Sequence, residues 1–310
     1  MWLISCILLV GCQSKIQKLN INTTEEYFEV QDDLQKRSSL LSENVCMFTG
    51  NENFNKDEIN QVHAVILCDV DDQKILYAKN AKKQIQPTTI TMLATALTIL
   101  EYMDLSTQVT VTDKALVGLG DAPVIGLKEG DCLTVEQLLA GMMYRSGFDC
   151  ANALAIACSS SINKFVKLMN KTVQSIGCVD TKFTSPGGST DPNQYTTVYD
   201  VYLIMNRLQT YEPFMDLISK KSYKISYQVK NGPVVEEEYT SSIPYVLGEY
   251  TLPKNLTLIG GKAGTTYLAG SCTALYLKDT KGKGYIAIGM KSQDKVTLYG
   301  QMEILFKKIQ

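Results

Sequence analysis

From residue 61 onward, the hydrophobic pattern divides the chain into a strand pair, a helical block, further strands and a final helix. The apolar runs Val62–Val70 and Lys74–Ala78 flank a polar turn, which is typical of a β-hairpin. The alternating segment Thr107–Thr112 also predicts a strand. Strands are predicted again towards the end of the chain, at Ser222–Val229, Val234–Thr240, Leu256–Gly260, Ser271–Lys278 and Gly284–Lys291.

Helical spacing of apolar residues dominates the middle third. It predicts helices at Pro87–Glu101, Leu133–Met143, Asp149–Cys158, Ile162–Ile176, Thr197–Leu208 and Val296–Lys308. Thr88 or Thr89 is placed to cap the first of these helices, and Thr134 leads into the second. Strands at both ends of the chain around a helical block predict an α+β fold. In it, one antiparallel sheet is formed from both chain ends and covered by helices, with a helical subdomain inserted.

The start of the chain has a different character. Trp2–Val10 is apolar but too short to span a bilayer, and it leads into Leu9-Val10-Gly11-Cys12, which resembles a bacterial lipobox. The resemblance implies a lipoprotein-type signal peptide at residues 1–11 and lipid on the thiol of Cys12. The domain would then be exported and lipid-anchored at the extracellular or periplasmic face of a bacterial membrane. The alternative is a signal peptide that is cleaved without lipidation.

Residues 12–60 are polar and predict a tether, and residues 61–310 predict the globular domain. Within the tether, Thr23-x-x-Glu26 is a possible capping box before a thin apolar stripe, which predicts one short helix. A spacer helix, packed on the domain or free, is favoured over a partner-binding helix, because thin stripes usually serve packing.

Charge and cysteine content exclude some classes of function. The formal net charge is −2, which gives no electrostatic argument for a nucleic-acid partner. Of nine cysteines, Cys6 leaves with the signal peptide and Cys12 is the lipidation site, so an odd number remains for the mature domain. Several of these lie in apolar runs, which favours buried free thiols. Metal-ligand spacing is missing, so the sequence predicts no metal site and no cofactor.

Several segments, taken in order from about His63 to the C-terminus, resemble the serine-type D-alanyl-D-alanine carboxypeptidases, peptidase S11, of the penicillin-binding protein and β-lactamase superfamily. The matching segments are VILCDVDDQKILYAKNA, PTTITMLATALTILE, VTVTDKALVGLGDAPVIGLKEGDCLTVEQLLAGMMYRSGFDCANALA, FVKLMNKTVQSIGCVDTKFTSPGG and GGKAGTTYLAGSCTAL. The resemblance implies a β-lactamase/transpeptidase-like fold. It also implies a mechanism in which a serine, deprotonated by the lysine one turn later in S-x-x-K, attacks the D-Ala-D-Ala carbonyl.

The same resemblance assigns the site residues. The nucleophile position is Thr89, the base position is Met92, and the second motif, S-x-N in the family, is Ser146-Gly147-Phe148. The third motif, K-T-G in the family, is Lys262-Ala263-Gly264, and the N–H of the following Thr265 is implied to form an oxyanion hole with the N–H of Thr89. The assigned positions are therefore Thr89, Met92, Ser146, Phe148, Lys262, Ala263, Gly264 and Thr265.

The chemistry of these positions predicts a catalytically degenerate protein. Methionine has no titratable group, so the Thr89 hydroxyl lacks its neighbouring base, and loss of a nucleophile or base in a serine protease costs about a million-fold in turnover. Phe148 and Ala263 remove two groups that would hold the substrate. The prediction is a cell-envelope protein that binds peptidoglycan stem peptide ending in D-Ala-D-Ala, or a cell-wall protein. The alternatives are residual hydrolysis with Thr89 as nucleophile and a ligand-free structural protein.

Other residues offer weaker chemistry. Ser161-Ile162-Asn163-Lys164 satisfies S-x-x-K, but it follows the second motif and lies inside a predicted helix. The only histidine, His63, lies in the opening strand, where a structural role is usual. Lys82 and Lys83 precede the Pro87 helix and are predicted to be a solvated pair. Ser185-Pro186-Gly187-Gly188 stands where relatives carry Asn-Pro-His-Gly, which is a further departure at the rim of the site.

Overall fold

The computed structural model describes residues 45–48 and 59–309, all within one compact unit. The predicted signal peptide at 1–11, the lipidation site Cys12 and the possible short helix of the tether lie outside the described residues. Within the described part, no helix is both long and apolar enough to cross a membrane.

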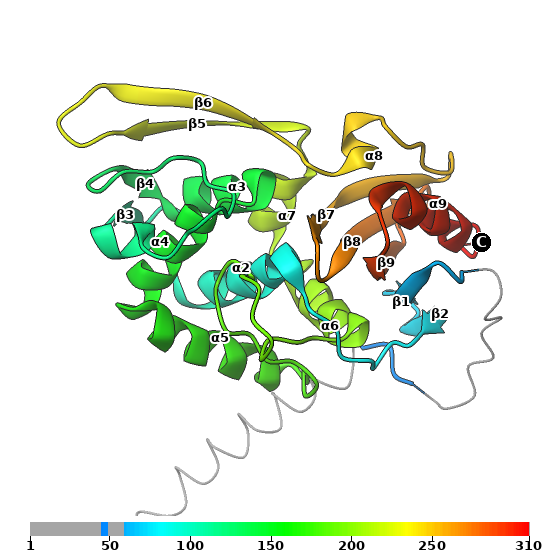
Figure 1. Ribbon diagram of the computed structural model, residues 1–310. Coiled ribbons are helices and arrows are strands. Elements are labelled where there is room, and N and C mark those ends of the chain that lie inside the picture. Colours follow the sequence, from blue (N-terminus) through cyan, green and yellow to red (C-terminus); the bar gives the residue numbers. More distant parts are fainter. Residues whose placement is uncertain (1–44, 49–58, 310) are drawn as a thin grey trace, which may run out of the picture. The chain divides into compact units, whose positions relative to one another are not determined.

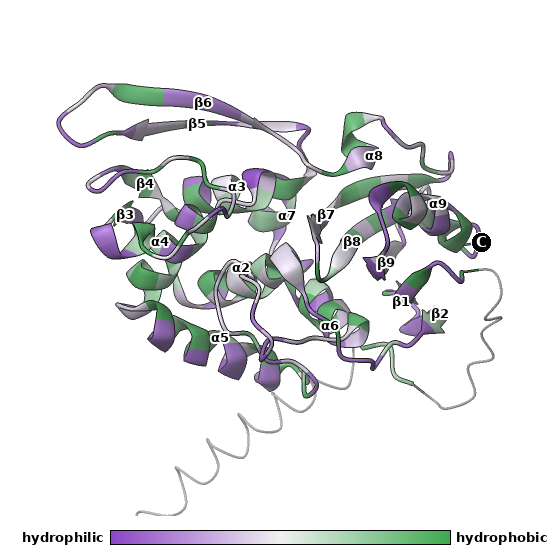
Figure 2. Cartoon of the chain, in the orientation of Figure 1, coloured by the Kyte–Doolittle hydropathy of each residue, from purple (hydrophilic) through white to green (hydrophobic). Residues whose placement is uncertain are grey.

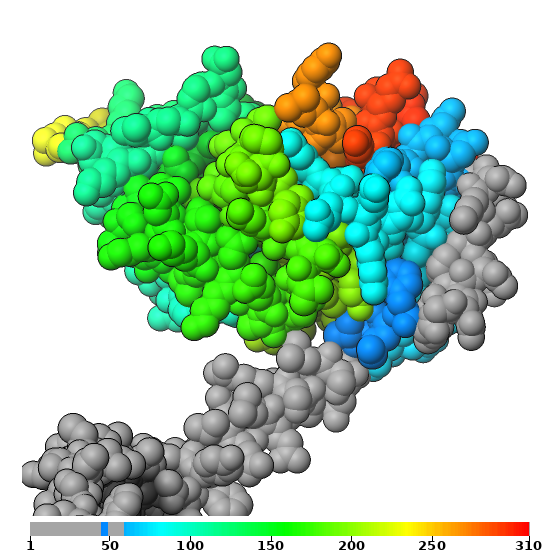
Figure 3. Space-filling model, turned by 60° about the horizontal axis from the view of Figure 1, so that its bottom comes forward, coloured from blue at the N-terminus to red at the C-terminus, as the bar shows by residue number. Residues whose placement is uncertain are grey.

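The centre of the domain is a five-stranded antiparallel sheet in the order β2-β1-β9-β8-β7. Its strands come from both ends of the domain: β1 Val62–Asp69, β2 Lys74–Lys79, β7 Leu256–Thr266, β8 Gly270–Asp279 and β9 Gly284–Ser292. The predicted hairpin and the single sheet built from both chain ends are therefore confirmed. Figure 3 shows the same closure on the surface, where blue and cyan residues lie beside orange and red ones.

Alternation within the strands explains how the sheet divides two cores. In β1, Ile66 and Cys68 point to one face, while Val65 and Leu67 point to the other, and all four are buried. The second face is covered by α9 (Lys295–Phe306), and the first by the helical block, as Figure 1 shows. Because both faces are buried, the strands read as nearly continuous apolar runs.

The helical block is inserted between β2 and β5. It contains η1 Thr88–Ile90, α2 Thr91–Tyr102, η2 Asp113–Leu116, α3 Val135–Arg145, α4 Phe148–Ser159, α5 Ile162–Ser175, α6 Val198–Leu208 and α7 Glu212–Ser219. Figure 2 shows the outer side of α5 in purple, and its inner side is apolar because Phe165, Met169 and Val173 recur at helical spacing. A short helix, α8 (Pro244–Leu247), follows later in the chain.

The structure differs from the sequence predictions in four respects. The strands β5 Ser222–Gln228 and β6 Val234–Thr240 join a separate sheet with β3 Gln108–Thr110 and β4 Cys132–Thr134, whereas one sheet was predicted.

The prediction of a Thr88 or Thr89 cap is wrong, because those residues form η1 and neither side chain caps the helix. Thr134 does cap α3, through a full capping box. The strand β7 extends beyond its predicted end to include the third motif, and α7 was not predicted.

The segment Val45–Phe48 packs against the domain through its backbone. The hydroxyl of Tyr202 accepts a hydrogen bond from Cys46 N at 2.7 Å, and the hydroxyl of Tyr199 donates to Cys46 O at 3.1 Å. The Phe48 ring lies 5.2 Å from the ring of Tyr199. The chain just before the predicted domain is therefore held in place by α6.

We expect Tyr202→Phe to lower the free energy of unfolding by about 1–2 kcal/mol, because the buried N–H of Cys46 loses its acceptor. Urea unfolding measures the change. The control is Tyr267→Phe, since Tyr267 is fully exposed and its hydroxyl should contribute nothing. Equal stability of wild type and Tyr202→Phe would show that the contact does not hold the segment.

Candidate active site

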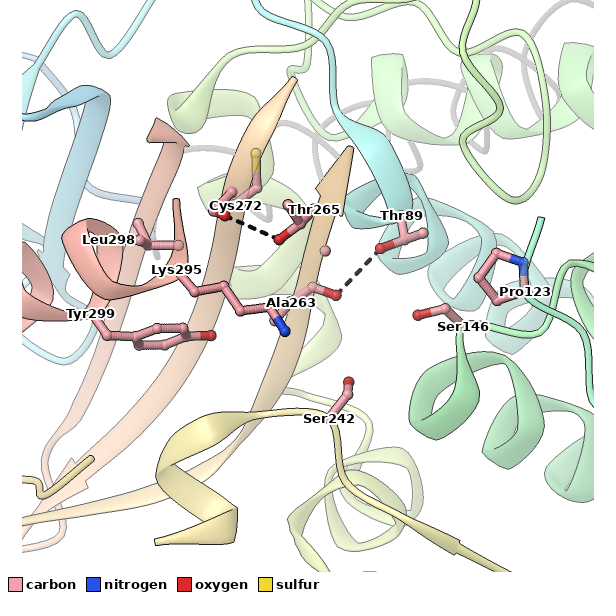
Figure 4. Close-up of a pocket in the computed structure, with 12 residues that line it drawn as sticks. Thr89, Pro123, Ser146, Ser242, Ala263, Thr265, Cys272, Lys295, Leu298 and Tyr299 are labelled. Carbon is pink, nitrogen blue, oxygen red and sulfur yellow. Dashed lines mark hydrogen bonds between the residues drawn. The ribbon is translucent and has the colours of Figure 1, made fainter. Parts of the chain in front are cut away.

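A pocket of about 250 Å³ opens where the helical block meets the edge of the sheet. Figure 4 shows side chains from η1, β7, β8, α9 and the connecting loops converging on it. The residues that line it are Thr89, Pro123, Ser146, Ser242, Ala263, Gly264, Thr265, Ser271, Cys272, Lys295, Leu298 and Tyr299. Five of the eight assigned positions, Thr89, Ser146, Ala263, Gly264 and Thr265, therefore line one cavity.

The corner that carries Thr89 is held tightly. Thr88 has a positive φ of 51°, which is strained for a β-branched residue, and its carbonyl lies against Gly188. A Cβ at Gly188 would lie 1.8 Å from Thr88 O, so only glycine fits there. The Thr89 hydroxyl donates to Ala263 O at 3.3 Å, and a Cβ at Gly264 would lie 2.2 Å from Thr89 Oγ1. The Thr89 side chain thus lies directly on β7.

The base position is closed off from the pocket. Met92 is completely buried in the core side of α2 and does not line the cavity. Lys82 and Lys83 are also absent from the lining, and Lys82 lies 5.2 Å over the Phe48 ring. None of these three residues is placed to take a proton from Thr89.

The second and third motifs meet at the wall of the pocket. Ser146 ends α3 in a left-handed conformation with φ 54°, and its Oγ lies 2.6 Å from Lys262 Nζ, although the two residues are 116 positions apart. Lys262 Nζ also donates to Ala263 O at 3.1 Å. The Lys262 side chain is only 1% exposed, and burial lowers its pKa to about 7. A substantial fraction of the amine is therefore neutral at neutral pH.

This pKa predicts a pH dependence of stability. Between about pH 7 and the usual lysine value of 10.5, Lys262 binds fewer protons in the folded state than in the unfolded state. Stability contributed through Lys262 therefore rises with pH across that window and is constant below it. We expect the free energy of unfolding of wild type, relative to Lys262→Met, to increase from pH 7 to pH 10 in urea titrations. A constant difference would contradict the lowered pKa.

The first turn of α4 supports the rim of the pocket. The Phe148 ring packs on Gly187, where a Cβ would lie 2.5 Å from the ring, and it is buried outside the cavity lining. The next residue, Asp149, accepts hydrogen bonds from the backbone N–H groups of residues 125, 126 and 127. Phe148 therefore does not fill the pocket, and Asp149 fixes the loop that brings Pro123 to it.

The strand β7 is the edge of the sheet, so alternate backbone groups face the pocket without a strand partner. Ala263 O points to this open side, because it accepts from Thr89. Residues two apart on a strand share a side, so the N–H of Thr265 faces the same way. The Thr265 hydroxyl lies 3.0 Å from Ser271 Oγ. The N–H of Thr265 therefore faces the open edge of β7, and its role as an oxyanion donor stays a prediction.

Sequence reasoning missed Lys295 at the first turn of α9. Its exposed side chain points into the pocket, as Figure 4 shows. It is the lysine among the lining residues, and it supplies a cation for an anionic ligand. Ser242 and Tyr299 were also missed. The sequence gives no local signal for these residues, since only closure of the sheet brings α8 and α9 beside β7.

The remaining candidate catalytic residues from the sequence lie outside the pocket. Ser161 caps α5 by accepting from Lys164 N, and His63 lies in β1, so neither lines the pocket. All seven cysteines of the described part are free thiols; Cys68, Cys150 and Cys272 are buried and Cys158 is half-buried. Across residues 45–48 and 59–309, no group of three potential metal ligands comes together.

The arrangement of sheet, helical block and pocket is that of the DD-transpeptidase fold. The crystal structure of the Streptomyces K15 DD-transpeptidase superposes with a TM-score of 0.73 at 22% identity, covering 80% of this chain and 96% of that one. A D-alanyl-D-alanine carboxypeptidase structure from Mycobacterium tuberculosis gives a TM-score of 0.70 at 22% identity, covering 80% of this chain and 90% of that one. These likenesses confirm the predicted fold class.

Sequence comparison identifies the family. The model of the D-alanyl-D-alanine carboxypeptidases, peptidase S11, matches residues 51–292, so the chain belongs to that family. It is similar to DacF of Bacillus subtilis, 31% identical over 158 residues, covering 49% of this chain and 40% of the relative. DacD of Escherichia coli is 29% identical over 219 residues, covering 64% and 56%. The chain thus spans about half the length of these curated relatives.

Proposed function

We propose that this protein binds the D-Ala-D-Ala end of a peptidoglycan stem peptide at the surface of the cell envelope and does not hydrolyse it by the nucleophile–base route of its family. One observation carries the proposal: the base position, Met92, is buried in the core while the pocket beside Thr89 stays open. An open cavity without a titratable group at position 92 fits a binding role. The lipid anchor at Cys12 would hold the domain near its ligand.

The geometry favours binding over residual hydrolysis at Thr89. The Thr89 hydroxyl donates to Ala263 O, so its proton is directed to a carbonyl and not to a base. An unactivated hydroxyl is a weak nucleophile. The open pocket also argues against a ligand-free structural protein, because Phe148 and Met92 do not fill it. A cell-wall protein whose chain ends in a carboxylate is the remaining alternative ligand.

The ligand's terminal carboxylate is assigned to the Lys295 end of the pocket. The ammonium of Lys295 is exposed and reaches the cavity, where it can form a charge-assisted hydrogen bond. The N–H of Thr265 on the open edge of β7 is placed for the peptide carbonyl. The Ala263 position lacks the hydroxyl that family members use for the carboxylate, so Lys295 takes a larger share of the binding.

Calorimetry tests the proposal. A diacetyl-L-lysyl-D-alanyl-D-alanine peptide should bind wild type, and the peptide ending in L-Ala-L-Ala should bind more weakly. Lys295→Ala should weaken binding about tenfold, or ~1.4 kcal/mol, because one charge-assisted contact is lost. The control Lys281→Ala removes an exposed lysine of the β8–β9 turn, far along the strands from the third motif, and should change nothing.

Two assays on the same samples separate the alternatives. Free D-alanine should not accumulate above the level without protein, and peptide mapping after incubation with a fluorescent penicillin should show no adduct on Thr89. Release of D-alanine that is lost in Thr89→Ala would establish residual hydrolysis. Absence of heat with every peptide would reject peptide binding.

A further inference from the structure

Ser146 and Lys262 form a hydroxyl–amine pair at the wall of the pocket. The distance from Ser146 Oγ to Lys262 Nζ is 2.6 Å, which is a short hydrogen bond. Ser146 is partly exposed and its hydroxyl points into the cavity in Figure 4, whereas the Lys262 side chain is buried and does not line the cavity. A ligand in the pocket therefore contacts the serine hydroxyl and not the amine.

The surroundings of Lys262 keep its amine available as a base. No carboxylate of the described residues lies within ion-pair distance of Nζ, and its hydrogen-bond partners are Ser146 Oγ and Ala263 O. In the structure Lys262 Nζ donates both to Ser146 Oγ and to Ala263 O. When the amine is neutral, its lone pair can accept from the serine O–H while an N–H still donates to the carbonyl. Burial alone, without a compensating anion, lowers the pKa of Lys262 to about 7. That value is close to the optimum for general-base catalysis at neutral pH.

The backbone at Ser146 adds a second observation. Its φ of 54° is unusual for a residue other than glycine, and it occurs at the end of α3 directly before Gly147 and α4. Such strained turns also present the nucleophilic serine in other hydrolases. The turn lifts the hydroxyl away from both helices and into the cavity.

We propose that Ser146 is a nucleophile and Lys262 its general base, and that the pair transfers the acyl group of short-chain esters. The activity goes beyond peptide binding and stands on the Ser146–Lys262 contact whether or not D-Ala-D-Ala peptides bind. Serine–lysine pairs perform acyl transfer on unrelated folds.

Hydrolysis of an ester through an acyl-serine needs water as its only co-reactant. Lys262 Nζ takes the Ser146 proton as Oγ forms a bond to the ester carbonyl carbon, and the carbonyl oxygen faces the N–H of Thr265. The bond to the alcohol oxygen then breaks, and Lys262 returns the proton to the departing oxygen. Water attacks the acyl-serine with Lys262 again as base, so the carboxylic acid leaves and Ser146 regains its proton.

Esters are the proposed substrates because this mechanism gives the leaving group one proton donor, Lys262. An amide nitrogen must be fully protonated before it leaves, whereas the C–O bond of an ester can break while the proton is still moving from Lys262 to the departing oxygen, so an ester needs less assistance from a single lysine. The cavity of about 250 Å³ has room for a short acyl chain. Leu298 and Pro123 provide apolar wall for that chain.

The test uses p-nitrophenyl acetate with the complete chain. Release of nitrophenol measures the rate, and tryptic peptide mapping locates the acetyl group. We expect acetyl on Ser146, and about a 100-fold or greater loss of rate in both Ser146→Ala and Lys262→Met. The matched control is Ser161→Ala, which removes the other serine that has a lysine three residues later and lies outside the pocket.

The pH profile gives an independent readout. The rate should rise as Lys262 loses its proton near pH 7 and then level off. The other titratable groups that face this region are Tyr144, Cys272, Lys295 and Tyr299. Burial raises the pKa values of Tyr144, Cys272 and Tyr299 to about 12, so they do not titrate in this window. Ser161→Ala, which lies outside the pocket, should keep the inflection near pH 7.

The acetylation site is located on the wild-type protein, so this result does not depend on whether the variants fold. Acetyl on Ser146 with an inflection near pH 7 supports the proposal. Acetyl on other residues only, or a rate that Ser146→Ala leaves unchanged, overturns it. The outcome is separate from that of peptide binding, because calorimetry with the D-Ala-D-Ala peptide does not depend on acylation.

Discussion

The double variant Thr89→Ser with Met92→Lys should lose ~3 kcal/mol of stability and should not regain full carboxypeptidase activity. Position 92 is completely buried, so the new ammonium loses its hydration without an anion to compensate it. Phe148 and Ala263 remain, so the substrate amide and the carboxylate still lack the two groups that the family motifs provide. Urea unfolding and release of D-alanine measure the two effects.

A quadruple variant that also carries Phe148→Asn and Ala263→Thr is the comparison for activity. We expect its D-alanine release to exceed that of the double variant by about 100-fold, in line with the cost of removing single transition-state contacts. For stability the control is Met92→Leu, which keeps the volume and should cost under about 1.5 kcal/mol. If the double and quadruple variants release D-alanine at the same measurable rate, residues 148 and 263 contribute little to activity.

Gly188→Ala should destabilise the domain by at least about 3 kcal/mol. The φ of Gly188 is 84°, which already disfavours alanine, and its Cβ would lie 1.8 Å from the carbonyl oxygen of Thr88. Backbone must move to remove that overlap, and the corner before α2 moves with it. We therefore expect a lower melting temperature and weaker peptide binding in the same variant.

Comparison with Gly177→Ala distinguishes the cost of a left-handed backbone from the cost of steric overlap with Thr88. Its φ is 94°, but the nearest atom to its Cβ is Leu203 Cδ1 at 3.6 Å, so only the cost of the left-handed conformation applies. That cost is of the order of 1 kcal/mol. Equal losses in the two variants would mean that the contact between Gly188 and Thr88 has no special weight.

Much of the fold followed from local pattern. The hairpin Val62–Lys79 and the strands β8 and β9 have apolar runs bounded by polar turns, and these features survive in the structure. The alternating pattern predicted the strand at Thr107–Thr112, which contains β3, but it did not predict β4 or the second sheet. β4 has three residues, too few to show a periodicity, and its pairing with β3 and with distant β5 depends on tertiary structure.

The site was predictable only in part. Resemblance located Thr89, Ser146 and Lys262, since each lies in a recognisable segment of sequence. The 2.6 Å contact between Ser146 and Lys262 depends on how α3 meets β7, which no local pattern encodes. Lys295 reaches the pocket because α9 covers one face of the sheet, so its place also depends on tertiary structure. Whether Phe148 fills the pocket or leaves it open also depends on tertiary structure, so the sequence did not decide it.

The left-handed backbone at Thr88 and Ser146 has a kinetic consequence. Thr88 directly precedes the lining residue Thr89, and Ser146 itself lines the pocket, so both conformations are set in the protein before any ligand arrives. An occupant therefore enters a cavity that is already shaped and orders little backbone on arrival. Its association rate is set by encounter and entry through the mouth of the pocket, with no slow conformational step in between.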